Sequence, residues 1–237
     1  MNYVNGFDKA LNFKKITNII VCVITVIFGI TAVIYKVNYE GGFWTCFREM
    51  TVNGTVFSTI VAGILIVVNT WELLRRKEII IPMVYYMRLS SVVTETIIFI
   101  VVLIGYIFQN YLPDDNPVFF RYDMLMMHVL VPALVIISFC VNDPPVNVDK
   151  KWKRLYGAFF ITLYAIVIIS LILAYVIPEN KIPYSFLNVR NTSIVFIAFC
   201  FVMIYAICYL LSWLYIWLNK RLYWLSYSAK WMNIISK

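Results

Sequence analysis

Six long apolar runs constrain the fold of this chain more than any other feature. They cover about residues 16–35, 50–71, 84–108, 122–142, 156–177 and 192–218, and roughly 20 apolar residues are enough for a helix to cross a bilayer. Of the 237 residues, 62% are hydrophobic and 14% charged, too little charge to cover a soluble domain of this size. We therefore predict an all-α polytopic membrane protein, with a single transmembrane domain over residues 1–237 and a bundle of six transmembrane helices. The runs are continuous rather than alternating, which argues against a membrane β-barrel.

The distribution of Lys and Arg predicts the orientation. Cytoplasmic loops of membrane proteins carry an excess of these residues, and 15 of the 20 fall on one side if both termini are placed in the cytoplasm. We therefore expect a multi-pass protein with cytoplasmic termini, in the plasma membrane if the chain is microbial. Attraction to anionic lipid accounts for the net charge of +8, so no nucleic-acid partner is expected. The 15 residues are Lys9, Lys14, Lys15, Arg75, Arg76, Lys77, Arg88, Lys150, Lys151, Lys153, Arg154, Lys220, Arg221, Lys230 and Lys237.

The fourth apolar run contains the only histidine of the chain, His128, and Pro132 follows four residues later. An ionisable residue within a membrane span is costly and is a functional candidate by default. Proline has no amide hydrogen to donate to the carbonyl of residue 128, so a helical irregularity is expected there. Asp123 would lie about 140° around the helix from His128, at roughly 100° per residue, which makes it a poor partner to orient the imidazole.

The second apolar run begins with a polar stripe. Residues three and four apart share a helix face, so Thr51, Thr55, Ser58 and Ala62 form one line, with Arg48 about a turn before it. Small and hydroxylated residues are also how membrane helices pack closely. The stripe therefore has two interpretations, a packing surface and a reactive surface.

Glu95 lies about halfway along the third apolar run, beside Ser91 and Thr94. A carboxylate in the middle of a membrane needs a partner or a raised pKa. Both a structural pairing and a functional role are consistent with this position.

Thr51 and His128 are expected at similar depth, because the second and fourth runs cross the membrane in the same direction and each residue lies near the start of its run. A hydroxyl beside an imidazole suits nucleophilic acyl chemistry, in which the imidazole accepts the hydroxyl proton and returns it to the leaving group. Arg48 or Arg121 could hold an anionic head group or stabilise the oxyanion. The alternative is that these polar residues only hold helices together.

Three short motifs resemble a known family. They are Phe47-Arg48-Glu49-Met50-Thr51 at the start of the second run, His128-Val129-Leu130-Val131-Pro132 in the fourth, and Pro183-Tyr184-Ser185-Phe186-Leu187-Asn188-Val189 before the sixth. In order and spacing the chain resembles the six-helix androgen-induced-type threonine hydrolases of fatty acid esters of hydroxy fatty acids, most of all their microbial integral-membrane relatives.

The resemblance implies that Thr51 is the nucleophile, that His128 assists it, and that an oily ester is cleaved within the bilayer. Two positions depart from the family pattern, because Asn188 and Ser138 stand where acidic residues are expected. Glu95 or Glu49 could replace the missing acid. A distantly similar branch transfers acyl chains with a cysteine, and Cys46 is close to Thr51 in sequence, so acyl transfer stays open.

The prediction is an intramembrane hydrolase of lipid esters that uses Thr51 and His128, with Thr55, Asn53 or Arg121 supporting the oxyanion or head group and no metal or cofactor. Its partners would be membrane lipids and the ester substrate. The rival prediction is a small transporter or a lipid-binding protein without catalysis, in which Glu95, His128 and Arg121 line a polar pathway. A lipid acyltransferase and a purely structural scaffold are further alternatives. A closed pocket joining Thr51 to His128 favours hydrolysis, and a polar path that reaches both faces favours transport.

Overall fold

The computed structural model describes residues 2–76, 79, 81–108, 121–148 and 150–235, and every regular element in these ranges is helical. Six helical stretches are long and apolar enough to cross a membrane, which confirms the predicted all-α polytopic fold. The elements are α1 (Asn2–Tyr39), α2 (Phe43–Cys46), α3 (Met50–Arg75), α4 (Pro82–Phe108), α5 (Tyr122–Leu125), a π-helical segment (Met126–Leu130), α6 (Val131–Val141), a 3-10 helix (Lys151–Ala158), α7 (Phe159–Leu173), 3-10 turns at Glu179–Lys181 and Ser185–Leu187, and α8 (Ile194–Ile235).

Several helix boundaries differ from those predicted. Helix α1 already begins at Asn2 rather than near residue 16, and α8 continues to Ile235 instead of ending near residue 218. Helix α7 ends at Leu173, before the predicted residue 177, because Tyr175 adopts a left-handed conformation with φ 59°. The amides of the next two residues then bond to the carbonyl of Leu171, which satisfies the end of the helix.

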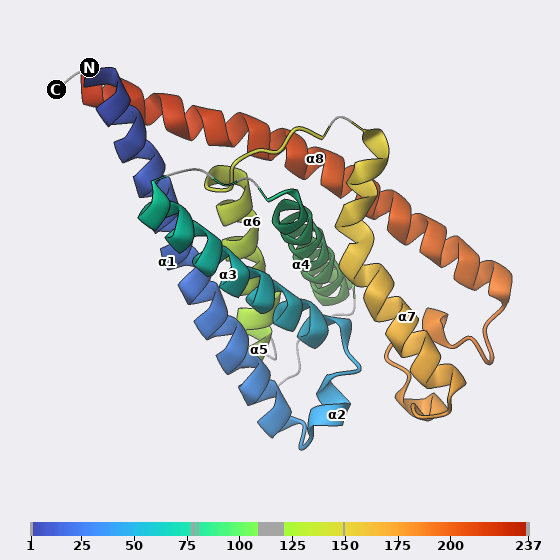
Figure 1. The fold of residues 1–237 in the computed structure, drawn as a ribbon. Helices are drawn as coiled ribbons and strands as arrows, with labels where there is room; N and C mark the ends of the chain where they lie inside the picture. The colour runs from blue at the N-terminus through green and yellow to red at the C-terminus, as the bar shows by residue number, and fades with distance from the viewer. Residues whose placement is uncertain (1, 77–78, 80, 109–120, 149, 236–237) are drawn as a thin grey trace.

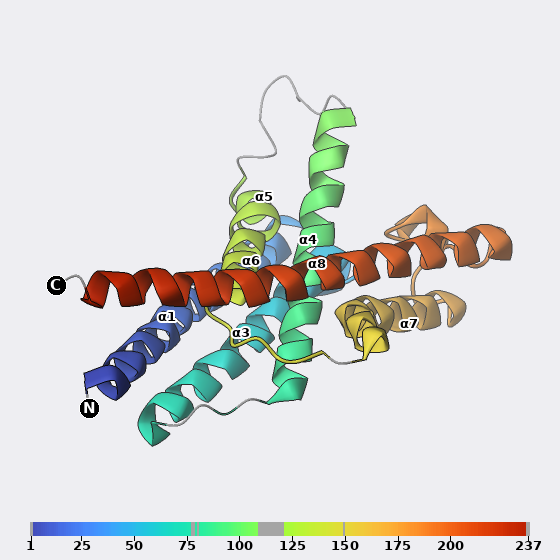
Figure 2. The same ribbon diagram turned by 90° about the horizontal axis from the view of Figure 1, so that it is seen from above.

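Helix α4 occupies the centre of the molecule, where it packs against α3, α6, α7 and α8 (Figures 1 and 2). In its apolar stretch 56% of the residues are buried, against 11% for the stretch in α8, so α4 is the core helix and α8 is peripheral. Figure 1 also shows both chain termini at one end of the molecule and α2 at the other. We call these the terminal end and the loop end.

Two hydrophobic clusters hold the central helices in place. The larger joins α4 to α6 and α8 through residues such as Leu89, Val135 and Phe139, all fully buried. A smaller one near the loop end contains Val52 of α3 and Met127 of the π-helical segment. Because Val52 follows Thr51 and Met127 precedes His128, this second cluster lies next to both predicted site residues in the chain.

Candidate functional site at the loop end

An apolar cavity of about 250 Å³ lies between α3, α4, α7, α8 and the 3-10 turn Ser185–Leu187. Its walls are almost entirely aliphatic and aromatic. Thr51 is the one aliphatic hydroxyl among its lining residues, which are Met50, Thr51, Ile97, Ile98, Val101, Val102, Ile161, Tyr164, Ala165, Tyr184, Phe186, Leu187, Phe201 and Ile204.

Thr51 occupies the first turn of α3, where two tyrosines secure the backbone. The Tyr164 hydroxyl donates to the Arg48 carbonyl at 2.5 Å, and the Met50 amide donates to the Tyr184 hydroxyl at 3.3 Å. Both phenols are therefore engaged in holding the start of the helix. The Thr51 hydroxyl, by contrast, makes no hydrogen bond to another described residue, so it is the available hydroxyl of the cavity wall.

His128 lies within the π-helical segment, and its side chain is only 7% exposed. Its Nδ1 is 3.0 Å from the carbonyl oxygen of Met124. A carbonyl can only accept, so Nδ1 carries the proton and Nε2 is left as the basic nitrogen. Pro132 stands in the first turn of α6 directly after the π segment, which confirms the expected irregularity. Single π-helical turns are frequent at functional sites.

Val52 and Met127, the neighbours of Thr51 and His128, belong to one hydrophobic cluster, but Thr51 and His128 are not bonded to each other. The cluster that contains Val52 and Met127 holds α3 beside the π segment. His128 does not line the cavity, and no hydrogen bond joins it to Thr51 in this structure. The structure therefore does not assemble a ready-made Thr-His pair.

Asp123 does not orient the imidazole of His128, in line with the prediction, because its carboxylate is bound to Arg121 and His128 Nδ1 is at the Met124 carbonyl. Arg121 Nε and Nη2 donate to the two oxygens of Asp123 at 2.6 and 2.7 Å, and this pair raises the pKa of Arg121. Arg121 also stacks over the Tyr39 ring. Arg121 precedes the helix with an extended backbone, ψ 136°, so its side chain does not follow the helical spacing that would place it on the face of His128.

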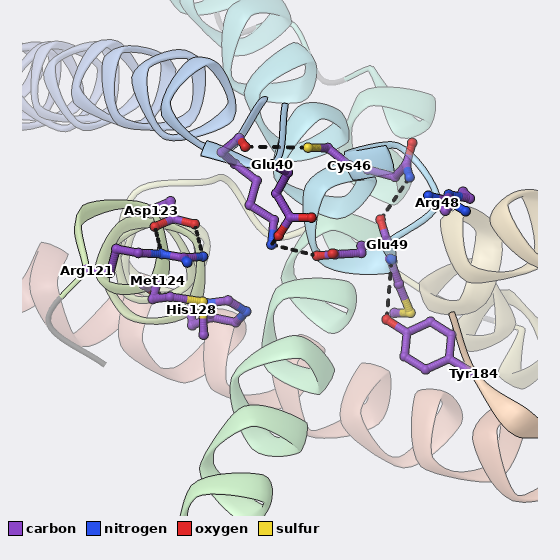
Figure 3. A network of polar contacts seen from close by, with 12 residues as sticks. Glu40, Cys46, Arg48, Glu49, Arg121, Asp123, Met124, His128 and Tyr184 are labelled. Carbon is purple, nitrogen blue, oxygen red and sulfur yellow. Dashed lines mark hydrogen bonds and ion pairs between the residues drawn. The ribbon is translucent and has the colours of Figure 1, made fainter. Parts of the chain in front are cut away.

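Charged side chains from α1, from the segment before α3 and from the start of α5 form a polar network near His128 (Figure 3). Lys36 bonds to Glu40 at 2.6 Å and to Glu49 at 3.3 Å. Burial raises the pKa of Glu49, while Lys36 opposes the shift. The carboxyl of Glu49 is thus held by Lys36 rather than by His128, and Glu49 does not replace the acid that the resemblance requires.

A second, polar cavity of about 280 Å³ lies at the surface near the first turn of α3. It is lined by Thr45, Arg48, Glu49, Lys181 and Pro183. Glu49 and Pro183 are followed directly by Met50 and Tyr184, which line the apolar cavity. A polar cavity with two cations therefore adjoins an apolar one, an arrangement that fits a molecule with a charged head and an oily tail.

Three further predicted site residues, Asn53, Thr55 and Asn188, do not line the apolar cavity. Both amide protons of Asn53 are used, on the carbonyls of Phe47 and Glu49 at 2.8 and 2.9 Å. Thr55 is fully buried outside the cavity. Asn188 follows the cavity residue Leu187, and its Oδ1 is buried without a hydrogen-bond partner. Asn53 is thus bound to the backbone at the start of α3, and neither it nor Thr55 lines the cavity.

Cys46, the candidate for acyl transfer, is fully buried in α2. Its thiol donates to the Lys36 carbonyl at 3.5 Å, and burial raises its pKa. The thiolate is the nucleophilic form, so this environment disfavours Cys46 as a nucleophile.

A buried network at the terminal end was missed by sequence reasoning. Arg88 was counted among the cations on the cytoplasmic side, and it is only 1% exposed, with its Nε donating to Asp143 at 3.1 Å. Asn18 donates to the same carboxylate at 2.7 Å and accepts from Ser138 at 2.5 Å. Ser138 therefore serves this network rather than His128. The available signal was an Arg placed four residues after the start of the predicted span 84–108.

Comparison of the chain with known protein families, curated proteins and solved structures does not identify its family. No family model, no curated protein and no solved structure matches the chain. The likeness to threonine hydrolases therefore stays a prediction, and function is inferred from the geometry of the loop end.

Proposed function

We propose that this protein binds ester lipids at the loop end and hydrolyses them, with Thr51 as nucleophile and His128 as general base. The observation that carries the proposal is the position of an unengaged hydroxyl in the wall of an apolar cavity of about 250 Å³. One water needs only about 10–15 Å³, so this cavity has room for a segment of an acyl chain. Its aliphatic and aromatic walls exclude water from the neighbourhood of the hydroxyl.

The chemistry follows from the state of the imidazole. Met124 holds the tautomer with a free Nε2, which takes the Thr51 proton as Oγ1 bonds to the ester carbonyl carbon. The imidazolium then protonates the departing alkoxide, and water cleaves the acyl-threonine by the reverse proton transfers. This requires Oγ1 and Nε2 to approach to about 3 Å when substrate is bound, since catalytic hydrogen bonds often tighten only in the complex.

The polar cavity at Arg48 and Lys181 would receive the head group. Both side chains are cationic and line the same hollow, and Arg forms strong hydrogen bonds to carboxylate and phosphate. An ester lipid with an anionic head would thus place its oily tail against Ile98 and its polar end at the surface. If the Lys and Arg asymmetry sets the orientation, this end faces outward and the substrate enters from the outer leaflet.

The direct test is hydrolysis of 4-methylumbelliferyl oleate by the purified protein in detergent. Thr51→Ala should remove turnover, and His128→Gln should lower it about 10²–10⁴-fold, the usual contribution of a general base. Thr59→Ala is the matched control, because Thr59 is on the same helix but bonds only to the Thr55 carbonyl. Full activity in Thr51→Ala would show that Thr51 is not the nucleophile.

The acyl cavity can be tested separately by filling it. Ala165 lines the cavity from α7 and is 6% exposed, so Ala165→Phe should block long-chain esters more than short-chain esters. Ala206→Phe adds the same ring to an exposed position on α8 and should leave the chain-length preference unchanged. Equal effects on all chain lengths would place the acyl chain elsewhere.

Lipid binding without catalysis is the second candidate, and the missing Thr51–His128 hydrogen bond favours it. In that case wild type would retain lipid through purification, native mass spectrometry would show it, and Ala165→Phe would lose it, while no variant would change ester hydrolysis. Transport receives less support. The apolar cavity shares no lining residue with a small cavity of about 40 Å³ near Arg88 at the terminal end.

A further inference from the structure

A groove of about 260 Å³ lies between α7 and α8 at the surface of the helix bundle. Five of its lining residues come from α7, and Phe201 and Tyr205 come from α8. Ile166 in its wall is 59% exposed, and an exposed apolar side chain on a membrane-spanning helix faces lipid. The groove is therefore open to the hydrocarbon of the bilayer.

The groove borders the apolar cavity of the candidate site through two shared residues. Ala165 of α7 and Phe201 of α8 line both hollows. Ala165 carries only a methyl group, so the Phe201 ring is the large side chain at the boundary. This ring packs on the hydrophobic cluster that contains Tyr164 and Ile168 of α7. Among the described residues, the polar cavity at Arg48 shares no lining residue with the apolar cavity, so the groove is its closer neighbour.

Hydrogen bonds fasten α8 to α7 and its preceding 3-10 helix at one end of the groove. The hydroxyls of Thr162 and Tyr205 are 2.6 Å apart, and Arg154 Nη1 donates to the Tyr209 hydroxyl at 3.3 Å. The 3-10 helix packs closely against α8, and α7 diverges from α8 beyond it (Figures 1 and 2). The two helices are thus fixed at one end and free to separate slightly at the other.

The boundary between groove and cavity lies in the diverging part. Ala165 comes three residues after Thr162, and Phe201 comes four residues before Tyr205, so both lie on the side of the loop that joins α7 to α8. Both side chains are apolar, so turning the Phe201 ring aside breaks no side-chain hydrogen bond. A lipid chain is about as apolar as the side chains it displaces. A chain that enters beside Phe201 therefore replaces most of the contacts that the ring loses.

We propose that the groove between α7 and α8 is the site through which the hydrocarbon chain of a membrane lipid passes between the bilayer and the apolar cavity, with Phe201 as the side chain that separates them. The inference rests on the proposed binding of lipid in the cavity, and it holds with or without hydrolysis. Val101 of α4 also lines the cavity and is 57% exposed, which makes it the rival entrance. The groove is favoured because its own apolar walls continue those of the cavity.

The test is the rate at which bound ¹⁴C-oleate exchanges for excess unlabelled oleate in the detergent-purified protein, measured by rapid gel filtration. Oleate is not an ester, so its release does not require hydrolysis. Ile166→Trp narrows the groove outside the cavity and should slow exchange about fivefold or more, because it raises the barrier to entry and release alike. Phe201→Ala should speed exchange. Val167→Trp is the matched control, because Val167 is 48% exposed and lines neither hollow, and it should exchange like wild type.

A second groove variant keeps the test independent of one substitution. Ser170 is exposed and lines the groove but not the cavity, so Ser170→Trp should also slow exchange. Unchanged exchange in both folded variants would overturn the proposed passage, and slower exchange in Val101→Trp alone would place the entrance at α4. Absence of bound oleate in folded wild type would instead overturn the cavity as a lipid site, and the passage with it.

Discussion

Replacing Asp143 by Asn should destabilise the protein strongly, because Asp143 neutralises the buried Arg88. Arg88 and Asp143 are 1% and 4% exposed, and the pair is 3.1 Å apart. The Nη1 and Nη2 atoms of Arg88 already lack hydrogen-bond partners, so Asp143 provides its principal compensation. The substitution keeps the shape of the side chain and an oxygen for the bond from Asn18, so the main loss is the negative charge.

The expected magnitude follows from the burial of the pair. Removing one partner of a buried ion pair typically costs about 3–5 kcal/mol, since it leaves an uncompensated charge. For a chain of this length, about 1 kcal/mol shifts the Tm by about 2–4 °C, so the expected decrease is roughly 6–20 °C. Arg88→Met combined with Asp143→Asn removes both charges and should recover at least half of that decrease.

The measurement is thermal unfolding of purified variants in one detergent, followed by intrinsic tryptophan fluorescence. Glu179→Gln is the control for loss of a carboxylate at an exposed position, and its Tm should stay within about 2 °C of wild type. Two results would refute the reasoning. They are a Tm of Asp143→Asn within about 2 °C of wild type, and a double variant whose decrease equals the sum of the two single decreases.

Two further predictions concern packing and cysteine reactivity. Gly157→Ala should lower stability by about 1–3 kcal/mol, because its Cβ would lie 1.9 Å from Ser212 Oγ, whereas Gly63→Ala has open space and should be neutral or stabilising in the same unfolding assay. Cys46 should resist N-ethylmaleimide in the folded protein, with reaction beginning only above the pH at which an ordinary thiol ionises, because burial raises its pKa and shifts thiolate formation to higher pH. Mass spectrometry should find the half-buried Cys200 modified first; rapid labelling of Cys46 at pH 8 would contradict this account of its environment.

Local sequence patterns predicted several details of the site correctly. The spacing of Thr55, Ser58 and Ala62 predicted one helix face, and all three are fully buried. Pro132 predicted an irregular helix near His128, and the π-helical segment lies there. Each of these depends on helical periodicity or on a missing amide hydrogen, which are properties of neighbouring residues.

The cavity at Thr51 and the burial of Arg88 could not be predicted from the neighbouring sequence. Thr51 belongs to the same line of α3 as Thr55, yet it lines a cavity because α7 and the turn before α8 leave space at that height. The burial of Arg88 was not predicted because a count of charges carries no information about Asp143, which is 55 residues away and lies just after α6.

Hydropathy by itself determined that this chain is a membrane protein with six apolar helices, because the cost of exposing the backbone to lipid makes a long apolar run helical whatever its neighbours are. Tertiary structure alone decided which buried charges have partners. The third apolar helix carries two ionisable residues, Arg88 and Glu95. Packing brings Asp143 to Arg88 and the Ser58 hydroxyl to Glu95, because the position of a partner depends on how distant helices cross and not on the sequence around either charge.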